Sequence, residues 1–161
     1  MDDLTQFSAT VAALLKARQE TVAVAESSAG GLISASLLAV PGSSSYFVGG
    51  GVIYTLAARG ALLPDGSGAL EGVRSASEPY AVWLARAVRE HLGATWGLAE
   101  TGASGPSGNR YGDKPGHTCL AVSGPVQQVR TIGTGSDDRQ SNMWNFTRGA
   151  LSLLEEILGE K

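Results

Sequence analysis

Two short motifs rich in glycine and hydroxyl side chains constrain the fold of this chain more than any other feature. The first, AESSAGG at residues 25–31, follows an apolar run, and the second, TGASGP at residues 101–106, follows another. Ligands of open α/β sheets bind beyond the carboxyl ends of the strands, so we expect both motifs to border one pocket. Glycine allows backbone N–H groups to approach a ligand, and a helix N-terminus there favours an anion. The motifs therefore predict an α/β protein with a polar, anion-binding pocket.

The spacing of apolar residues predicts helices and strands in the order α-β-α-β-α-α-β-β-β-α. We expect helices at residues 3–18, 31–40, 56–63, 77–91 and 138–158, and strands at residues 21–25, 46–55, 95–99, 117–123 and 126–132. The early crossovers favour parallel strands, and Gly124-Pro125 favours a hairpin near the end. These elements predict a three-layer α/β/α fold with a mixed, mostly parallel five-stranded sheet. Because residues 64–72 look like a surface loop rather than a boundary, residues 1–161 are expected to form a single domain.

Composition argues against several classes of protein. The formal net charge is −3, whereas a surface that binds nucleic acid is normally basic. No apolar run approaches the ~20 residues that span a bilayer, and the acidic N-terminus does not resemble a signal peptide. The single cysteine, Cys119, allows no internal disulfide, and the only histidines are His91 and His117. We therefore expect a cytoplasmic protein with no metal, no cofactor, and no nucleic-acid or membrane partner.

Ser27 and Ser28 lie between a predicted strand and a predicted helix. A serine at such a position can be a nucleophile, because the helix N-terminus stabilises a developing oxyanion. The alternative is that one of the two serines only caps the helix. Glu26 is open to two interpretations as well: it binds a cation or a ribose hydroxyl, or it complements the helix dipole.

Further candidate groups follow the second strand and the second motif. Tyr54 either orients a serine hydroxyl or is an amphipathic residue at a strand end. Arg59 either holds a phosphate or carboxylate bidentately or is a solvated surface charge. The glycine loop over residues 102–116 can hold a phosphate through its amides. Lys114 either brings a cation to the same pocket or belongs to an ordinary turn.

In combination, these motifs resemble the CinA carboxy-terminal domain family, the nicotinamide mononucleotide (NMN) deamidases. The family patterns A-E-S-C-T-G-G, V-P-G-x-S, T-G-x-A-G-P and K-P-x-G correspond to the residues that begin at 25, 40, 101 and 114. A G-G-V strand that ends in a tyrosine, Tyr54, also matches. The match covers nearly the whole chain, in order and at similar spacing. The larger CinA proteins carry an amino-terminal domain for which this chain has no room, so we expect a stand-alone form.

The resemblance implies a homo-oligomer that takes a small nucleotide as substrate. It implies hydrolysis of the carboxamide of NMN to nicotinate mononucleotide and ammonia, in pyridine nucleotide salvage and without a metal. The catalytic residues that it implies are Ser27 as nucleophile, together with Tyr54 and Arg59. The substrate-binding residues expected from the matching motifs are Glu26, Ser28, Gly30, Gly31, Ser44, Thr101, Gly102, Gly105 and Lys114.

Two positions depart from the family pattern in a way that bears on catalysis. Arg59 stands where the family has its catalytic lysine, and an arginine stays protonated and cannot serve as a general base. Met143 stands where the family has an arginine early in the last helix, so an anion contact is expected to be lost. Arg110, Arg139 and Arg148 are alternatives for that contact. We therefore predict a weakened NMN deamidase, and the alternative is a CinA-like protein that binds a nucleotide or small anion without turnover.

Overall fold

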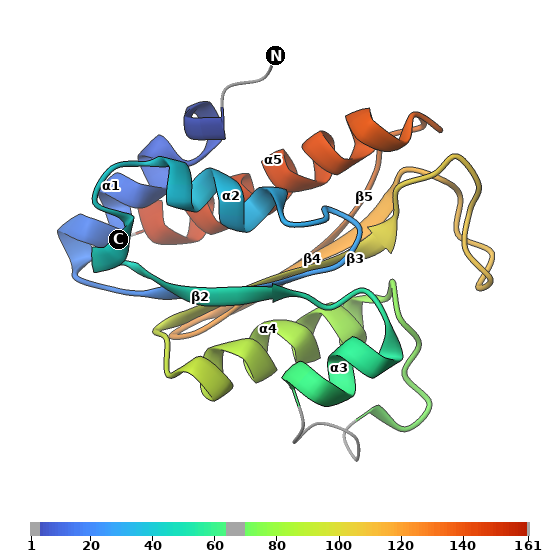
Figure 1. Ribbon diagram of the computed structural model, residues 1–161, viewed down its shortest axis with the longest axis horizontal. Coiled ribbons are helices and arrows are strands. Elements are labelled where there is room, and N and C mark those ends of the chain that lie inside the picture. The colour runs from blue at the N-terminus through green and yellow to red at the C-terminus, as the bar shows by residue number, and fades with distance from the viewer. Residues whose placement is uncertain (1–3, 64–69, 161) are drawn as a thin grey trace.

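The computed structural model describes residues 4–63 and 70–160. Its centre is a five-stranded sheet with the spatial order β2-β1-β3-β4-β5 (Figure 1). The strands are β1 (Val22–Glu26), β2 (Phe47–Val52), β3 (Trp96–Ala103), β4 (His117–Ser123) and β5 (Gln127–Gly133). Strands β1, β2 and β3 are parallel, and β4 runs antiparallel to both β3 and β5. The predicted mixed five-stranded sheet is confirmed.

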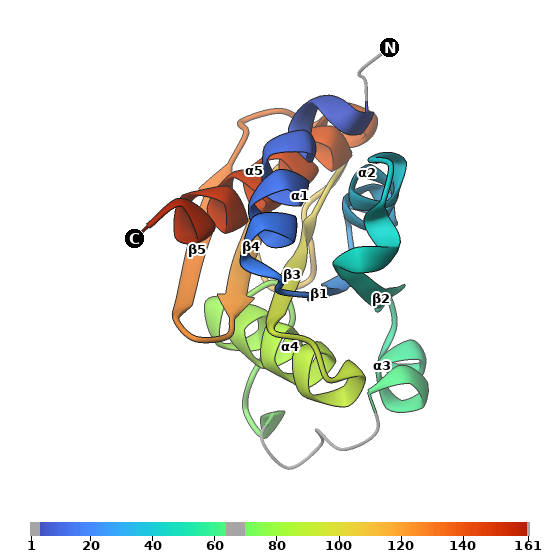
Figure 2. The same cartoon turned by 90° about the vertical axis from the view of Figure 1, so that its left-hand side faces the viewer.

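Helices cover both faces of this sheet, which gives the three layers visible in Figures 1 and 2. The helices on one face are α1 (Ala9–Arg18), α2 (Leu32–Ala39) and α5 (Arg139–Gly159). The helices on the other face are α3 (Leu56–Leu62) and α4 (Glu78–Leu92). Two 3-10 turns, η1 (Leu4–Phe7) and η2 (Ser43–Ser45), precede α1 and β2. The expected helix over residues 3–18 is therefore divided into η1 and α1.

Side-chain caps fix the start of the two longest helices. The Ser77 hydroxyl accepts a hydrogen bond from the backbone N–H of Tyr80 at the start of α4. The Asp138 carboxylate accepts one from the backbone N–H of Ser141 at the start of α5. Each cap satisfies an N–H group that has no partner within its own helix. These caps place both helix starts within a residue of their predicted positions.

The sheet separates two hydrophobic clusters. On the side of α1, α2 and α5, the cluster includes Leu15, Ile33 and Phe146. On the side of α4, it includes Leu84 and smaller residues such as Ala99. All five residues of β1 are buried, which explains why this strand reads as a continuous apolar run rather than an alternating one.

Three consecutive glycines lie within β2, which forms one side edge of the sheet. A Cβ added to Gly50 would lie 2.7 Å from the backbone oxygen of Val24 in β1 and 3.1 Å from the hydroxyl oxygen of Ser34 in α2. A side chain at this position would therefore collide with the neighbouring strand and helix. The lack of a side chain at Gly50 therefore allows β2 to pack closely against β1 and α2.

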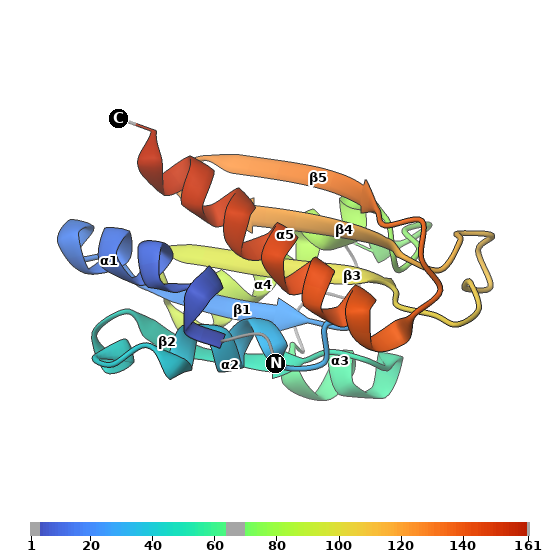
Figure 3. The same ribbon diagram turned by 90° about the horizontal axis from the view of Figure 1, so that it is seen from above.

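The carboxyl ends of β1, β2 and β3 lie at one end of the sheet, beside the start of β4 (Figure 3). The turn after β1, the segment after β2 and the loop over residues 104–116 all leave the sheet there. The end of the sheet at which η2 enters β2 is the opposite one. The direction of the strands therefore decides which predicted site residues can meet.

Candidate functional site

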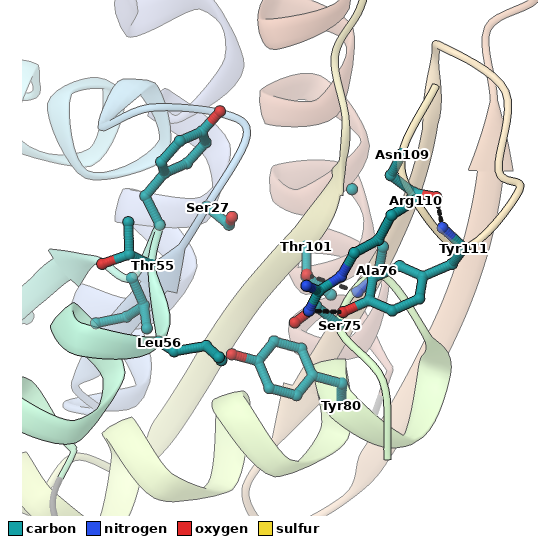
Figure 4. A pocket seen from close by; sticks show the side chains of 13 residues that line it. Ser27, Thr55, Leu56, Ser75, Ala76, Tyr80, Thr101, Asn109, Arg110 and Tyr111 are labelled. Carbon is teal, nitrogen blue, oxygen red and sulfur yellow. Dashed lines mark hydrogen bonds between the residues drawn. The ribbon is translucent and has the colours of Figure 1, made fainter. Parts of the chain in front are cut away.

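A polar cleft of about 310 Å³, which we call the Ser27 cleft, opens beyond the carboxyl ends of β1 and β3. Figure 4 shows Ser27 on one side of this cleft, with Arg110 and Tyr111 on the other side and Tyr80 below them. The residues that line it are Ser27, Ile53, Tyr54, Thr55, Leu56, Ser75, Ala76, Tyr80, Thr101, Gly102, Asn109, Arg110 and Tyr111. The structure therefore brings Ser27, Tyr54, Thr101 and Gly102 together, as the sequence predicted.

The turn that carries Ser27 is held from below by the buried carboxyl group of Glu100. The backbone N–H groups of Ser27 and Ala29 donate to Glu100 Oε2 at 3.0 and 2.8 Å. The hydroxyls of Ser28 and Thr118 donate to Glu100 Oε1 at 2.5 and 2.9 Å. Burial raises the pKa of Glu100, although these four donors favour the charged form. Glu100 therefore fixes the backbone from which the Ser27 side chain projects.

Sequence reasoning did not single out Glu100. The signal was present, because Glu100 is a charged residue at the end of an otherwise apolar run, directly before the Thr101-Gly102 motif. Charged residues are rarely buried completely without partners. A carboxylate in a buried strand next to a serine-rich turn therefore points to a hydrogen-bonded pair, and Ser28 is that partner.

The other glutamate of the first motif, Glu26, caps α2. Its carboxylate accepts hydrogen bonds from the backbone N–H groups of Ile33 and Ser34, both at 3.0 Å, and from the Ser34 hydroxyl at 2.8 Å. The structure thus favours the helix-dipole interpretation of Glu26 over substrate binding, because the side chain is fully buried and its carboxylate binds the N–H groups at the start of α2. The residue at the helix start itself is Gly31, whose φ of 100° suits glycine. Neither Ser27 nor Ser28 caps α2, so that alternative is wrong.

Thr101 and Gly102 lie near the end of β3 and line the Ser27 cleft. The Thr101 hydroxyl oxygen accepts a hydrogen bond from the backbone N–H of Ala76 at 3.1 Å, which leaves its own proton available. A Cβ added to Gly102 would lie only 2.3 Å from the backbone oxygen of His117 in β4. The glycine is therefore required for the pairing of β3 with β4 at this point.

A second recess of about 250 Å³, which we call the glycine-loop hollow, adjoins the Ser27 cleft. The residues that line it are Ser28, Tyr54, Gly102, Ala103, Ser104, Gly105, Ser107, Gly108, Asn109 and Arg139. Arg139 donates hydrogen bonds to the Gly105 carbonyl oxygen at 2.6 Å and to the Tyr54 hydroxyl at 3.3 Å. Tyr54 lines both recesses, and its exposed side chain binds Arg139 through the hydroxyl.

The loop between β3 and β4 contributes Asn109, Arg110 and Tyr111 to the cleft, and of these the sequence suggested only Arg110, as an alternative anion contact. Asn109 Oδ1 accepts hydrogen bonds from the backbone N–H groups of Tyr111 and Asp113, at 3.0 and 3.1 Å. Arg110 donates to the Tyr111 hydroxyl at 2.8 Å and lies over the Tyr111 ring. This hydrogen bond lowers the pKa of Tyr111. No sequence pattern would have shown that the loop folds back over the cleft.

An ion pair ties this loop to the segment before α4. The Arg74 guanidinium binds the Asp113 carboxylate through two hydrogen bonds of 2.6 and 3.1 Å. This contact is the main cause of the lowered pKa of Asp113. Asp113 also accepts a hydrogen bond from Asn109 at 2.8 Å, so the turn and the ion pair support each other.

Several predicted substrate-binding residues lie outside both recesses. Ser44 is exposed in η2, at the opposite end of the sheet, because β2 runs parallel to β1. Lys114 is exposed beyond the turn of the glycine loop. Gly30 lies against Met143, whose methyl carbon would be 2.7 Å from a Cβ at that position. Along with Gly31 and Glu26, these residues line neither recess, whereas Ser28 and Gly105 line the glycine-loop hollow.

Arg59 lies beside the Ser27 cleft without lining it. Its guanidinium lies over the rings of Tyr80 and Trp83, at 5.8 and 6.0 Å from the ring centroids. Tyr80 lines the cleft, whereas Arg59 itself does not. Arg59, which the resemblance implied as a catalytic residue, therefore packs on two aromatic rings and does not line the cleft.

Residues 4–63 and 70–160 contain no cluster of three or more histidine, cysteine, aspartate or glutamate side chains arranged to hold a metal ion. Within the same residues, no helix has the length and apolar character needed to cross a membrane.

The fold and the cleft together define a class: three-layer α/β/α domains with a hydroxyl-lined cleft beyond the carboxyl ends of parallel strands. Within that class the chain belongs to the CinA C-terminal domain family, whose sequence model matches residues 4–158. The family resemblance predicted from the motifs is thereby confirmed.

Individual relatives agree with this assignment. A CinA-like protein of Chlorobium limicola is 36% identical over 96% of this chain and 38% of its own length. A CinA-like protein of Desulfosudis oleivorans is 42% identical over 93% of this chain and 37% of its own length. The chain thus spans a little more than a third of the length of these curated relatives.

Solved structures show the same fold. A competence damage-inducible protein A from Klebsiella pneumoniae aligns over 99% of both chains with a TM-score of 0.90 at 24% identity. A competence/damage inducible protein from Agrobacterium tumefaciens covers 99% of this chain and 98% of its own, with a TM-score of 0.88 at 25% identity. The arrangement of layers and strands is therefore that of the CinA superfamily.

Proposed function

We propose that this protein hydrolyses the carboxamide of nicotinamide mononucleotide, giving nicotinate mononucleotide and ammonia. One observation carries the proposal: in a CinA-family fold, Ser27 lies half-buried in a polar cleft beyond the end of β1. The volume of about 310 Å³ is at the lower end of the range of roughly 300–1,000 Å³ that is usual for small-molecule sites. A compact mononucleotide is therefore a suitable ligand in size.

Ser27 is the proposed nucleophile. Its Oγ attacks the amide carbon, and the Oγ proton passes to the nitrogen as the C–N bond breaks and ammonia leaves. Water then hydrolyses the resulting ester, which releases nicotinate mononucleotide and restores the Ser27 hydroxyl. The Ser27 N–H is already bonded to Glu100, so the oxyanion needs other donors. Tyr54 and Thr101 suit this role, because each hydroxyl oxygen accepts one hydrogen bond from the protein and keeps its own proton for donation.

The proposed reaction has no strong proton acceptor in the cleft. Among the described residues that line it, none is a carboxylate, a lysine or a histidine. The residue at the position of the family lysine is Arg59, and an arginine cannot serve as a general base; its guanidinium lies over the Tyr80 ring and does not line the cleft. Because a positioned general base typically contributes about 10²–10⁴-fold to the rate, we expect slow turnover.

A second candidate function is binding of NMN or a similar anionic nucleotide without turnover. The observation that favours it is the position of Arg59, which stacks on Tyr80 and Trp83 instead of reaching Ser27. Loss of the proton acceptor removes catalysis without removing the cleft. The two candidates therefore differ in chemistry and share a ligand.

Ammonia release from excess NMN, with a parallel binding titration, separates the candidates. We expect the wild type to release ammonia slowly and Ser27→Ala to release none while its affinity for NMN changes by less than about threefold. Ser152→Ala, on the exposed side of α5, is the matched control and is expected to behave as the wild type. Binding in all three proteins without ammonia supports the second candidate. No binding and no ammonia rejects NMN as the ligand.

A further inference from the structure

The Ser27 cleft contains a positive charge that no carboxylate of the described chain neutralises. Arg110 extends from the glycine loop into the cleft, opposite Ser27 (Figure 4). Among the residues described, the ion pairs of the protein do not include Arg110, and its hydrogen bond is to the neutral phenol of Tyr111. The Arg110 side chain is exposed where it lines the cleft, so its charge is open to an anionic ligand.

The immediate surroundings of Arg110 add to this positive charge. The guanidinium groups of Arg110 and Arg74 lie 5.0 and 5.2 Å from the centroid of the Tyr111 ring. Only Arg74 has a carboxylate partner, Asp113, which binds it through both oxygens. The group of two guanidinium ions and one carboxylate therefore keeps one positive charge, and an anionic ligand would balance it.

The chain holds Arg110 in position before any ligand binds. Its two neighbours are fixed, because Asn109 accepts hydrogen bonds from the backbone of Tyr111 and Asp113. The Tyr111 ring and hydroxyl then orient the guanidinium itself. A preorganised cation loses little conformational freedom on binding, which favours affinity.

We propose that Arg110 binds the phosphate group of a pyridine mononucleotide and thereby selects the phosphorylated substrate over the nucleoside. The inference rests on the proposed function for the identity of the ligand. A guanidinium matches the oxygens of a phosphate with two parallel N–H donors, and one amino group of Arg110 suffices for Tyr111. The carboxamide and the phosphate lie at opposite ends of NMN, as Ser27 and Arg110 lie on opposite sides of the cleft.

The other cations near the two recesses are less suited to this role. Lys114, which the sequence suggested, lines neither recess. Arg139 lies in the glycine-loop hollow and already donates to the Gly105 carbonyl and the Tyr54 hydroxyl. Of these three cations, Arg110 is the one whose residue lines the Ser27 cleft.

The test measures equilibrium binding of NMN and of nicotinamide riboside, which lacks the phosphate, in a Ser27→Ala background. This background removes the proposed nucleophile, so a failure of the deamidase proposal leaves the binding measurement intact. Loss of a charge-assisted contact in Arg110→Gln is expected to weaken NMN binding about 10- to 100-fold. Binding of the riboside is expected to stay within about twofold. The matched control is Arg86→Gln, an exposed arginine of α4 that lines neither recess, and it is expected to change neither affinity.

Three results would overturn the inference. The first is an Arg110→Gln variant, folded by its thermal melt, that binds NMN as tightly as the parent or loses both ligands equally. The second is a loss specific for the phosphate in Arg139→Gln and none in Arg110→Gln, which would place the phosphate in the glycine-loop hollow. The third is failure of the parent to bind NMN at millimolar concentration.

Discussion

At the scale of single residues, the site depends on side chains that act on the turn rather than on the ligand. Glu100 binds two backbone N–H groups and the Ser28 hydroxyl, and so fixes the direction of Ser27. This arrangement requires the carboxyl group of Glu100 to be completely buried. The protein therefore combines a well-defined nucleophile position with a buried group that is sensitive to pH.

The raised pKa of Glu100 predicts how stability changes with pH. Protonation is favoured in the folded state, so its contribution is fully present below the unfolded pKa near 4.5 and is lost as pH rises through the folded value. In Glu100→Gln the amide oxygen accepts the two N–H groups and the amide NH₂ donates to the Ser28 and Thr118 hydroxyls. We expect the variant to melt at a higher temperature than the wild type at pH 8. The shift is about 2–4 °C for each kcal/mol gained in the free energy of unfolding, and it disappears towards pH 4.5.

Thermal melts from pH 4.5 to 8 measure this effect. Glu100→Ala is the contrasting variant, because it leaves the four donors without an acceptor. Each buried donor without a partner costs roughly 1–3 kcal/mol of stability, so this variant is expected to melt at a lower temperature than the wild type at every pH. Parallel pH profiles for the wild type and Glu100→Gln would show that Glu100 does not titrate differently on folding.

Arg59 gives a second prediction at the same scale. A lysine can lose its proton and an arginine cannot, so Arg59→Lys is expected to raise the rate of ammonia release from NMN at least tenfold. This gain in rate requires the side chain of residue 59 to move away from the rings of Tyr80 and Trp83 and towards Ser27. Steady-state rates with a parallel NMN titration provide the measurement. A folded variant that binds NMN and gains no rate contradicts this explanation of the slow turnover.

At the scale of secondary-structure elements, β3 carries the site. Residues on one of its faces, such as Glu100, hold the Ser27 turn, and Thr101 faces the segment before α4. The strand is longer than the sequence predicted, ending at Ala103, and the predicted loop therefore begins later than residue 102. Pairing with β4 explains the difference: Gly102 and Ala103 pair with Thr118 and His117, a tertiary contact that overrides the local preference of glycine for loops.

The close contact between β3 and β4 makes Gly102 a sensitive position. In Gly102→Ala the new methyl group would collide with the His117 backbone oxygen, and such overpacking usually costs about 1–3 kcal/mol. We expect the melting temperature to fall by roughly 2–12 °C, at 2–4 °C for each kcal/mol. Gly133→Ala in β5 is the matched control, because nothing lies within 4 Å of its added Cβ. Equal melting temperatures for the two variants would contradict the argument.

At the scale of the whole molecule, the fold was more predictable than the site. Periodicity predicted the type and order of the helices and strands, because buried strands and amphipathic helices leave a repeating pattern. Strand direction is a property of the complete sheet, so the sequence placed Ser44 in a pocket that lies at the other end. Arg110 enters the cleft because the glycine loop folds back onto Arg74, a contact between residues far apart in the chain. The homo-oligomer implied by the resemblance stays a prediction.

In the proposed reaction, the two sides of the Ser27 cleft have separate roles. Ser27 and the hydroxyls of Tyr54 and Thr101 act at the carboxamide, and Arg110 holds the phosphate at the far side of the cleft. A mononucleotide would then span the cleft from the Ser27 turn to the glycine loop. Both ends of this arrangement depend on the position of the same strand, β3.

The most direct test of this account compares ammonia release from excess NMN by the wild type and by Ser27→Ala under identical conditions. The account predicts slow release by the wild type, with one nicotinate mononucleotide formed for each ammonia, and none by the variant. Equal rates for the two proteins would exclude Ser27 as the nucleophile. NMN that is bound by the wild type and recovered unchanged would show that the cleft binds the nucleotide without hydrolysing it.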